Sequence, residues 1–437
     1  MSDGARHNVD YLIIGGGIAG TTAAEAIRSK DERGAIAILS KEPYELYSRV
    51  LLPKYVEGAL SREQVFLRTA EDYNRQNISL FSSEEATVLD TKRKEVRTRR
   101  GAVFFYKQLL IAAGGRVKPW RVEGSENVPV TRFHTIADAE ALRAKVMEGQ
   151  APKVVIIGGG FIALELLNAI VPRGATDIHL LLPEKRFWED YIGFEGSALI
   201  EQRLERSGIF LHHHEAVTST RLHEDGTIAI FTSRQISYPA DILAVGIGLD
   251  RELEPFSGGG IEVKRGILTN EFLETAVADV WAAGDIAEFF HPVYGKPLLI
   301  GNWNNAFLQG RIAGLNMAAM QMKSGEQKAF TYIPLYAIDV LGVHIAFLGD
   351  VSASREHTNR TFVSRFSSEG GSASGGEEGA WYEQFGMQDG KLVSAVFINK
   401  FEDKRIIERL IAEQRDCAPF IPYLSDASVA LADHISL

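Results

Sequence analysis

Two stretches of the chain share one pattern of hydrophobic and polar positions. The first runs Tyr11-Leu-Ile-Ile-Gly-Gly-Gly-Ile-Ala-Gly20, and the second runs Val154-Val-Ile-Ile-Gly-Gly-Gly-Phe-Ile-Ala163. In each, a wholly apolar run precedes three glycines, and apolar residues at helical spacing follow. A strand buried on both faces, a tight turn and a packed helix produce this order. The repeat is too long for a solenoid and predicts a duplicated nucleotide-binding unit.

Each unit continues into a second apolar strand, at residues 35–39 and 178–182, and each strand is followed by a carboxylate, Glu42 or Glu184. A third patterned region extends from Asp241 to Asp285, and a helix is expected from Asn305 to Met322. Strands that alternate with helices predict an α/β fold with two Rossmann-like dinucleotide-binding domains.

The pattern changes near Phe330 to alternating, strand-like runs. We expect strands at residues 337–348, 361–366, 381–387 and 392–399, followed by a helix at 403–414. Residues 367–379 are rich in glycine and serine and are interpreted as a mobile hairpin connection inside this part. The sequence therefore predicts a C-terminal α+β domain.

The order of these regions predicts four segments. They are a first FAD-binding part at 1–120, an NAD(P)-binding domain at 121–247, a second FAD-binding part at 248–328 and the C-terminal domain at 329–437.

Composition narrows the possible functions. The 437 residues carry a formal net charge of −10, which argues against nucleic acid as a general partner. Apolar runs stay below the length of a membrane helix and the N-terminus is polar, so a cytoplasmic protein without membrane attachment is expected. Adjacent histidines at 212–214 would point to opposite faces of a strand, and no metal site is predicted.

The spacing of the glycines in the first turn predicts that it binds a diphosphate. Gly15 permits a tight turn, Gly17 lets a diphosphate approach the backbone, and Gly20 lets the helix pack on the strand. The diphosphate then lies at the positive N-terminus of the helix, and Glu42 is placed to accept hydrogen bonds from a ribose. These residues predict a dinucleotide site.

The second turn, with Gly158, Gly160 and Ala163, predicts another dinucleotide site, because alanine is tolerated at the third position. Glu184 beyond it favours NAD, since a carboxylate repels a 2′-phosphate. Lys185 and Arg186 could accept that phosphate, so NADP stays possible.

Three further motifs resemble the two-dinucleotide flavoprotein reductases, a glutathione-reductase-like family. The segment Thr269–Asp285 resembles the family's second FAD fingerprint, in which the last carboxylate, here Asp285, holds the ribityl chain. Residues 106–115, with Ala113 and Gly114, are similar to the strand that closes over the flavin. The segment Trp303–Met317, with Trp303 and Ala306 at its start, resembles the helix that faces the isoalloxazine ring. The resemblance implies FAD and NAD(P) as cofactors.

The stretch Tyr44–Lys54 holds no cysteine where dithiol members of the family carry two, and the single cysteine is Cys417. It resembles instead the NADH:rubredoxin, ferredoxin and nitrite reductase flavoproteins. The resemblance implies that Arg49 contacts the FAD diphosphate side and that Lys54 lies near the flavin N5. It also implies that Glu165 pairs with this lysine and touches the nicotinamide, beside the loop of Gly248.

These features predict an enzyme that transfers a hydride between nicotinamide and FAD, and electrons between FAD and an external iron–sulfur carrier or subunit. It could act as a homodimer or as the NAD-linked flavin subunit of a larger hetero-oligomer, such as a 2-oxoacid oxidoreductase. An NADH oxidase or quinone reductase is one alternative. A non-catalytic redox sensor that holds FAD and NAD is another.

Overall fold

The computed structural model of the chain describes residues 5–147, 151–351, 359–367 and 379–435. They divide into two compact units. Unit 1 comprises Met1–Val50, Arg62–Arg116 and Asp250–Tyr332, and unit 2 comprises Leu51–Ser61, Val117–Leu249 and Ile333–Leu437. The chain thus enters each unit more than once, as expected when a nucleotide-binding unit is inserted into another. No helix in the described part is long and apolar enough to span a membrane.

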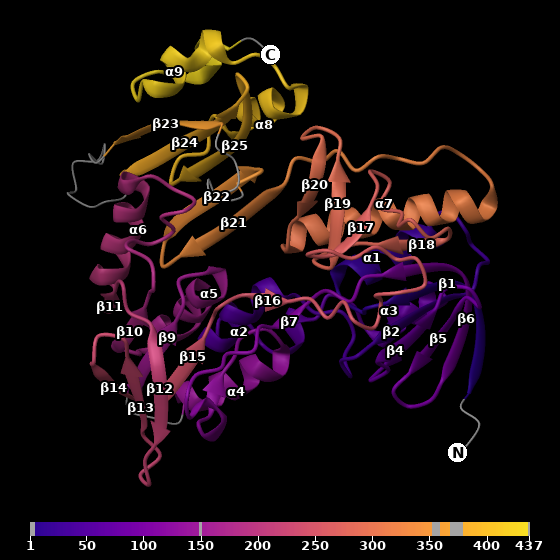
Figure 1. Ribbon diagram of the computed structural model, residues 1–437, viewed down its shortest axis with the longest axis horizontal. Coiled ribbons are helices and arrows are strands. Elements are labelled where there is room, and N and C mark those ends of the chain that lie inside the picture. The colour runs from indigo at the N-terminus through magenta and orange to yellow at the C-terminus, as the bar shows by residue number, and fades with distance from the viewer. Residues whose placement is uncertain (1–4, 148–150, 352–358, 368–378, 436–437) are drawn as a thin grey trace. The chain divides into compact units, whose positions relative to one another are not determined.

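Unit 1 is built on a sheet of order β3-β2-β1-β6-β5-β4, with β18 paired to β6 (Figure 1). Strand β1 runs parallel to β2 and β6, whereas β4, β5 and β6 pair as an antiparallel meander. Tyr11 and Ile13 face one core and Leu12 and Ile14 the other, which explains the unbroken apolar run. The strands are β1 (Arg6–Ile14), β2 (Ile36–Ser40), β3 (Ile78–Ser82), β4 (Ala86–Asp90), β5 (Glu95–Thr98), β6 (Val103–Ile111) and β18 (Val280–Ala282).

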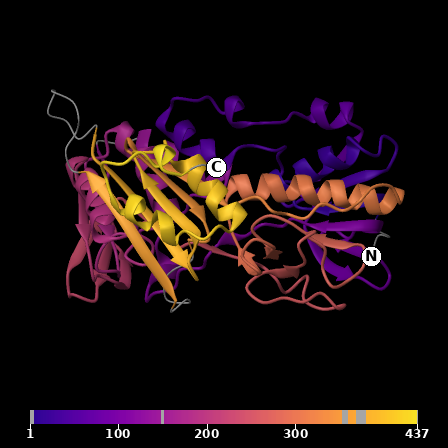
Figure 2. The ribbon, with the colours of Figure 1, turned by 90° about the horizontal axis from the view of Figure 1, so that it is seen from above.

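Two helices cover one face of this sheet, α1 (Ile18–Arg28) and the long α7 (Trp303–Met322), which is the orange helix of Figure 2. They touch backbone to backbone. A Cβ on Gly310 would lie 2.2 Å from Ala19 O, and one on Gly314 would lie 2.4 Å from Ala23 O. Unit 1 also holds α3 (Ala70–Arg75) and a small sheet of β17 (Ile267–Thr269), β19 (Ala287–His291) and β20 (Lys296–Leu299).

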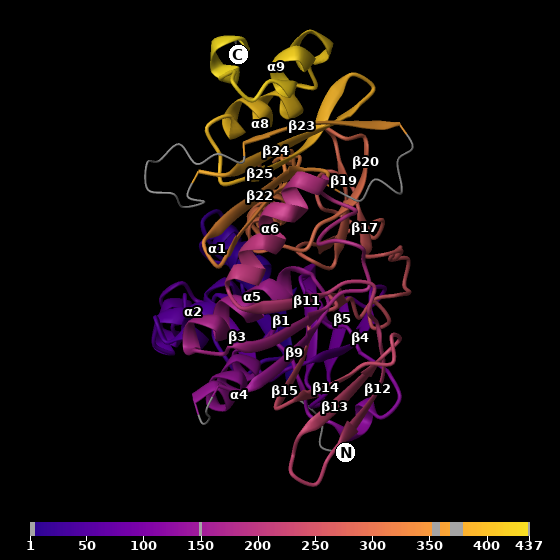
Figure 3. The same ribbon diagram turned by 90° about the vertical axis from the view of Figure 1, so that its left-hand side faces the viewer.

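Unit 2 contains a five-stranded sheet of order β11-β10-β9-β15-β8, parallel throughout, as predicted for a second nucleotide-binding unit. A separate three-stranded antiparallel sheet, β12-β13-β14, lies beside it (Figure 3). The strands are β8 (Val130–Thr131), β9 (Lys153–Ile157), β10 (Asp177–Leu181), β11 (Ile209–His212), β12 (Val217–Leu222), β13 (Ile228–Thr232), β14 (Ser237–Ala240) and β15 (Ile242–Val245). The helices of unit 2 are α2 (Leu52–Glu57), α4 (Ile136–Met147), α5 (Phe161–Ile170) and α6 (Phe194–Arg206). The chain passes between the two units at β7 (Arg116–Val117) and β16 (Leu249–Asp250), which pair as a short ribbon.

The C-terminal part is an antiparallel sheet of order β21-β22-β25-β24-β23, covered on one face by α8 and α9 (Figure 3). One predicted strand, 337–348, is in fact a hairpin, because Leu341 and Gly342 both adopt positive φ and turn the chain. Most of the predicted 367–379 connection lies outside the described residues. The elements are β21 (Leu335–Val340), β22 (Val343–Gly349), β23 (Arg360–Ser367), β24 (Trp381–Gln388), β25 (Lys391–Ile398), α8 (Lys404–Glu413) and α9 (Ile421–Ser425).

A buried ionic cluster ties this sheet to the C-terminal segment. The fully buried guanidinium of Arg365 donates to Glu383 Oε2 at 2.7 Å and to Asp403 Oδ2 at 2.6 Å. Its Nη1 also donates to the carbonyl oxygens of Asp426 and Val429, at 3.1 and 2.9 Å. Removing Arg365 would leave Glu383 and Asp403 buried with only Lys400 of the described cations nearby, whose Nζ lies 3.3 and 4.0 Å from them, so the arginine is expected to be important for stability.

Candidate functional site

The glycine turn after β1 is shaped for a diphosphate. Gly15 has a φ of +119°, and a Cβ there would lie 2.1 Å from Ala112 O, so only glycine fits this turn. A Cβ on Gly20 would lie 1.9 Å from Gly15 O, so glycine is needed there as well. Gly17 is the N-cap of α1, and a Cβ there would meet no atom within 4 Å. The first turn of α1 therefore offers free N–H groups and a positive helix end to an incoming phosphate.

Glu42 lies beyond β2 and is already engaged. Tyr47 Oη donates to Glu42 Oε2 at 2.6 Å, and Arg49 Nη2 bonds Glu42 Oε1 at 2.5 Å. Burial opposes the charge on Arg49, but Tyr47, Glu42 and Asp285 outweigh it and raise its pKa. Each carboxylate oxygen of Glu42 keeps a further lone pair, so it can still accept from a ribose hydroxyl. The structure thus brings the two predicted residues Glu42 and Arg49 together as an ion pair.

Asp285 follows β18, and its carboxylate has no hydrogen-bond partner in the part of the chain that the structure describes. Burial raises its pKa, and Arg251 and Arg49 oppose that shift. The preceding Gly284 lies against the first turn of α1, since a Cβ there would lie 3.1 Å from Ala19 Cβ. A desolvated, unpartnered carboxylate beside the glycine turn suits a ligand that carries hydroxyl groups.

The remaining predicted FAD residues frame the same region of unit 1. Ala113 and Gly114 follow β6, and a Cβ on Gly114 would meet nothing within 4 Å. Trp303 is the first residue of α7, which Asn302 caps by accepting from Asn305 N at 2.8 Å, and Ala306 is buried one turn later. Gln309 accepts from Gly284 N at 2.7 Å and leaves its Nε2 buried without a partner.

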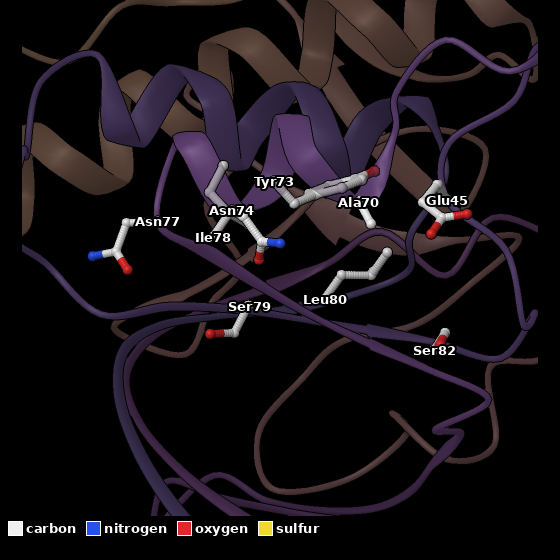
Figure 4. Close-up of a pocket in the computed structure, with 9 residues that line it drawn as sticks. All are labelled: Glu45, Ala70, Tyr73, Asn74, Asn77, Ile78, Ser79, Leu80 and Ser82. Atoms are coloured by element: carbon white, nitrogen blue, oxygen red, sulfur yellow. The ribbon is translucent and has the colours of Figure 1, made fainter.

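These observations fit FAD. Gly17 leaves room for a diphosphate at the start of α1, the Asp285 carboxylate could accept from ribityl hydroxyls, and the buried Nε2 of Gln309 has no acceptor among the described residues. FAD, when bound, supplies a centre that accepts a hydride and releases electrons singly or in pairs. A separate pocket of about 280 Å³ between α3 and β3 is lined by none of these residues (Figure 4). Its lining residues are Glu45, Ala70, Tyr73, Asn74, Asn77, Ile78, Ser79, Leu80 and Ser82.

The second glycine turn, in unit 2, repeats the geometry of the first. Gly158 has a φ of +97°, and a Cβ there would lie 2.8 Å from Gly246 O. Gly160 is the N-cap of α5, and Ala163 replaces the third glycine and packs against Gly246. Gly248, with a φ of +94°, faces open space. An alanine fits at 163 because Gly246 opposite it has no side chain.

The loop after β10 carries the residues that would read the second ribose. The side chains of Glu184 and Lys185 are exposed, whereas Arg186 is bound inward. Arg186 Nη1 donates to Ile192 O at 2.7 Å, and its Nη2 donates to Glu189 O at 3.2 Å. The Arg186 guanidinium is therefore bound within the loop and is not available to a 2′-phosphate beside Glu184, an arrangement that favours NAD.

Trp188 fixes this loop to the glycine turn. Its Nε1 donates to Gly159 O at 2.8 Å, and its backbone has a φ of +53°, unusual for a bulky residue. The ring also packs against Phe161, Phe187 and Phe347, at centroid distances of 5.0 to 5.1 Å. Trp188 carries no signal in the sequence, because no local spacing links a tryptophan beyond the second strand to the preceding glycine turn.

Lys54 does not form the expected pair with Glu165. Its Nζ bonds Glu57 Oε2 at 2.8 Å, three residues along α2, and the side chain is 59% exposed. The pKa of Glu165 is shifted by burial alone, with no contribution from a lysine. The expected Lys54–Glu165 contact is therefore wrong for this structure, because the i,i+3 partner on the same helix captures the ammonium group.

Glu165 instead lies in aromatic surroundings on α5. Burial raises its pKa from 4.5 to about 7. Its neighbour is Tyr336, whose pKa is raised by burial and by the charge of Glu165. Tyr336 packs on Phe161 at a centroid distance of 4.0 Å. A carboxyl group that titrates near neutrality at the start of a nucleotide-binding helix is a candidate functional group.

The histidines at 212–214 do not all lie in one strand, and His212 belongs to a polar network. Only His212 lies in β11, and His214 has a positive φ. His212 bonds His179 at 2.8 Å and Tyr238 at 3.1 Å, and Tyr238 donates to the buried Glu215. No cluster in the described residues could hold a metal ion.

Cys417 is buried in unit 2 and is not disulfide-bonded. Burial raises the pKa of its thiol, which disfavours the reactive thiolate. The residue thus has the properties of a structural cysteine.

The chain is similar to known flavoprotein reductases in its sequence. The family model described as "Pyridine nucleotide-disulphide oxidoreductase" matches residues 9–310. The chain is 26% identical over 420 residues to the NADH-dependent phenylglyoxylate dehydrogenase subunit epsilon of Aromatoleum evansii, covering 95% of this chain and 94% of that protein. It is 27% identical over 425 residues to the ferredoxin–NAD(+) reductase component of the anthranilate 1,2-dioxygenase system of Burkholderia cepacia, covering 96% and 98%.

The fold also has a counterpart among solved structures. The crystal structure of the covalent putidaredoxin reductase–putidaredoxin complex includes a chain that superposes with a TM-score of 0.84 at 24% identity, covering 98% of each chain. The likeness confirms the predicted α/β fold class with its Rossmann-like units.

Proposed function

Because the chain belongs to the pyridine nucleotide-disulphide oxidoreductase family and is an FAD-dependent NAD(P)H oxidoreductase, we propose that its electrons pass from NADH through FAD to an external iron–sulfur protein. The single observation that carries this proposal is the lack of a usable thiol. The stretch Tyr44–Lys54 holds no cysteine, and Cys417 is buried with a raised pKa. Electrons that no thiol receives must leave for an acceptor outside this chain.

The site residues support this proposal in distinct roles. Asp285 would hold the ribityl hydroxyls and Glu42 the adenosine ribose of FAD, while Gly17 opens the helix end to the diphosphate. Glu184 would hold the ribose of NAD, and Glu165 would contact the nicotinamide. Lys54 is a further candidate at the flavin, and its exposed, flexible side chain could exchange Glu57 for another partner.

Two kinds of relative support the external acceptor. One is the ferredoxin–NAD(+) reductase component of a dioxygenase system, and the other is a subunit of an NADH-dependent dehydrogenase of the 2-oxoacid phenylglyoxylate. The chain would accordingly act as a free reductase or as the NAD-linked flavin subunit of a 2-oxoacid oxidoreductase. The clusters would lie on other chains, since the single cysteine cannot ligate one.

The test is anaerobic reduction of the purified protein with NADH, followed by mixing with an oxidised [2Fe–2S] ferredoxin, with rubredoxin or with air. We expect the flavin to be reoxidised much faster by one of the iron proteins than by oxygen. Rapid reaction with oxygen and none with either iron protein would favour an oxidase. Native purification with identification of co-eluting chains then separates a free reductase from a subunit of a complex.

A further inference from the structure

One arginine that the sequence motifs do not mark lies against the FAD residues of unit 1. Arg251 follows β16, and its Nε donates to the backbone oxygen of Asp285 at 2.5 Å. A Cβ on Gly301 would lie 3.4 Å from the Asp285 carboxylate and 3.7 Å from Arg251 Nη2, so the guanidinium and the carboxylate flank the same glycine. The side chain is thus held by Nε, with its terminal amino groups beside Asp285.

Those terminal amino groups are not engaged. Within the described residues, Nη1 and Nη2 of Arg251 make no hydrogen bond or ion pair, yet burial lowers the pKa of the guanidinium, and the nearby Asp285 only partly offsets this. The guanidinium is thus partly buried while its terminal donors, unpaired among the described residues, stay accessible, as expected of a cation that an anionic ligand completes.

The position of Arg251 indicates which anion. Asp285 follows Gly284, and Gly284 packs against Ala19 in the first turn of α1. Gly17, the N-cap of the same helix, leaves space for a diphosphate. The bond from Arg251 Nε to Asp285 O therefore holds the guanidinium on the segment whose preceding residue, Gly284, packs against the first turn of α1. Arg49, the cation that the family resemblance implies for the diphosphate side, is paired with Glu42 at 2.5 Å.

We propose that Arg251 binds the diphosphate of FAD with its two terminal amino groups. A guanidinium can donate two parallel hydrogen bonds to a phosphate, a geometry that a lysine cannot reproduce. The contact neutralises charge that is present in both redox states of the flavin, so it stabilises FAD binding without favouring oxidised or reduced FAD. The proposal rests on FAD binding and not on the identity of the electron acceptor.

The experiment compares full-length Arg251→Gln and Arg251→Lys with Arg99→Gln, which removes an equally charged but 69% exposed side chain of unit 1. Serial dilution of each holoprotein, monitored by the fluorescence of released FAD, gives the dissociation constant. We expect Arg251→Gln to weaken FAD binding by about 10- to 100-fold, Arg251→Lys by less, and Arg99→Gln not measurably. The midpoint potential of the bound flavin should stay within error of the wild-type value.

Unchanged FAD release from both Arg251 variants would overturn the proposal. A weakened affinity together with a lowered potential would also overturn it, because the arginine would then stabilise the reduced ring rather than the diphosphate. If Arg251→Gln does not fold, the dissociation constant of FAD is compared between Arg251→Lys and Arg99→Gln instead. None of these readouts uses an electron acceptor, so failure of the proposed function leaves the result interpretable.

Discussion

The fold raises the pKa of Glu165, and this shift links the stability of the protein to pH. Its pKa is raised by burial to about 7, so between pH 4.5 and pH 7 the folded protein holds a proton that the unfolded chain has released. Stability contributed by this site is therefore full below pH 4.5 and is lost as the pH rises through 7. Burial of the ionised Glu165 carboxylate therefore lowers the stability of the fold at neutral pH. A functional contact with the nicotinamide would explain why a glutamate stands at this position.

We predict that Glu165→Gln is more stable than the wild-type protein at pH 8, by roughly 1 to 3 kcal/mol, and equally stable at pH 4. Urea unfolding at both pH values measures the difference, with the exposed Glu205→Gln as the control. A difference that does not vary with pH would contradict the assignment. Binding of NADH should also lose any pH dependence centred near 7 in the Gln variant.

The residues of the site were predictable to different degrees. Gly15 and Gly17 were predicted from the geometry of a glycine turn, whereas Asp285 was predicted only from a resemblance to a family fingerprint. Arg251 carried no such signal, since its partner lies far along the chain. The partner of Lys54 was misjudged, because a resemblance transfers residue types but not the local competition that Glu57 provides.

At the scale of elements, the loop after β10 and the second glycine turn form one assembly through the Trp188 hydrogen bond to Gly159. We predict that Trp188→Phe, which keeps the ring packing but loses the donor, weakens NADH binding by about 3- to 10-fold. Titration of the holoprotein with NADH under non-turnover conditions gives the dissociation constant. Trp120→Phe, a partly buried tryptophan of the same unit, is the control. Equal effects in both variants would mean that the bond has no special role.

The C-terminal sheet depends on Arg365 in a different way. We predict that Arg365→Met destabilises the protein by about 3 to 5 kcal/mol, because Glu383 and Asp403 would remain buried without it. Denaturant unfolding measures the loss. Arg409→Gln, which breaks an exposed ion pair with Glu413, should cost less than about 1 kcal/mol. Comparable losses in the two variants would show that the buried cluster is not the anchor described.

Elements were predicted better than their turns. The alternation of apolar residues identified the strands of the C-terminal part, yet it ran on through Leu341 and Gly342 and concealed the hairpin there. Hydrophobic periodicity records which face is buried, and both strands of an antiparallel pair can keep the same alternation across a tight turn. A glycine that follows an apolar residue was the available signal.

At the scale of the whole molecule, the lack of a redox-active disulfide limits how many electrons the protein can take up per FAD. We predict that anaerobic titration reduces the flavin completely with about one NADH per FAD and that no further equivalents are taken up, because FAD accepts two electrons and no redox disulfide exists. The absorbance of the flavin measures the end point. Cys417→Ser should titrate identically. Uptake of a second equivalent would reveal another redox group.

The backbone contact between α1 and α7 has a consequence for how the chain can vary. Gly310 and Gly314 lie one turn apart and face Ala19 and Ala23. One residue inserted into α7 before Gly310 would rotate these glycines by about 100° relative to Trp303 and Ala306 at the start of the helix. The helix could then present either its first turn or its glycines correctly, but not both. Insertions should therefore be tolerated after Lys323 and excluded before Gly314, so that length variation in this unit is confined to its loops.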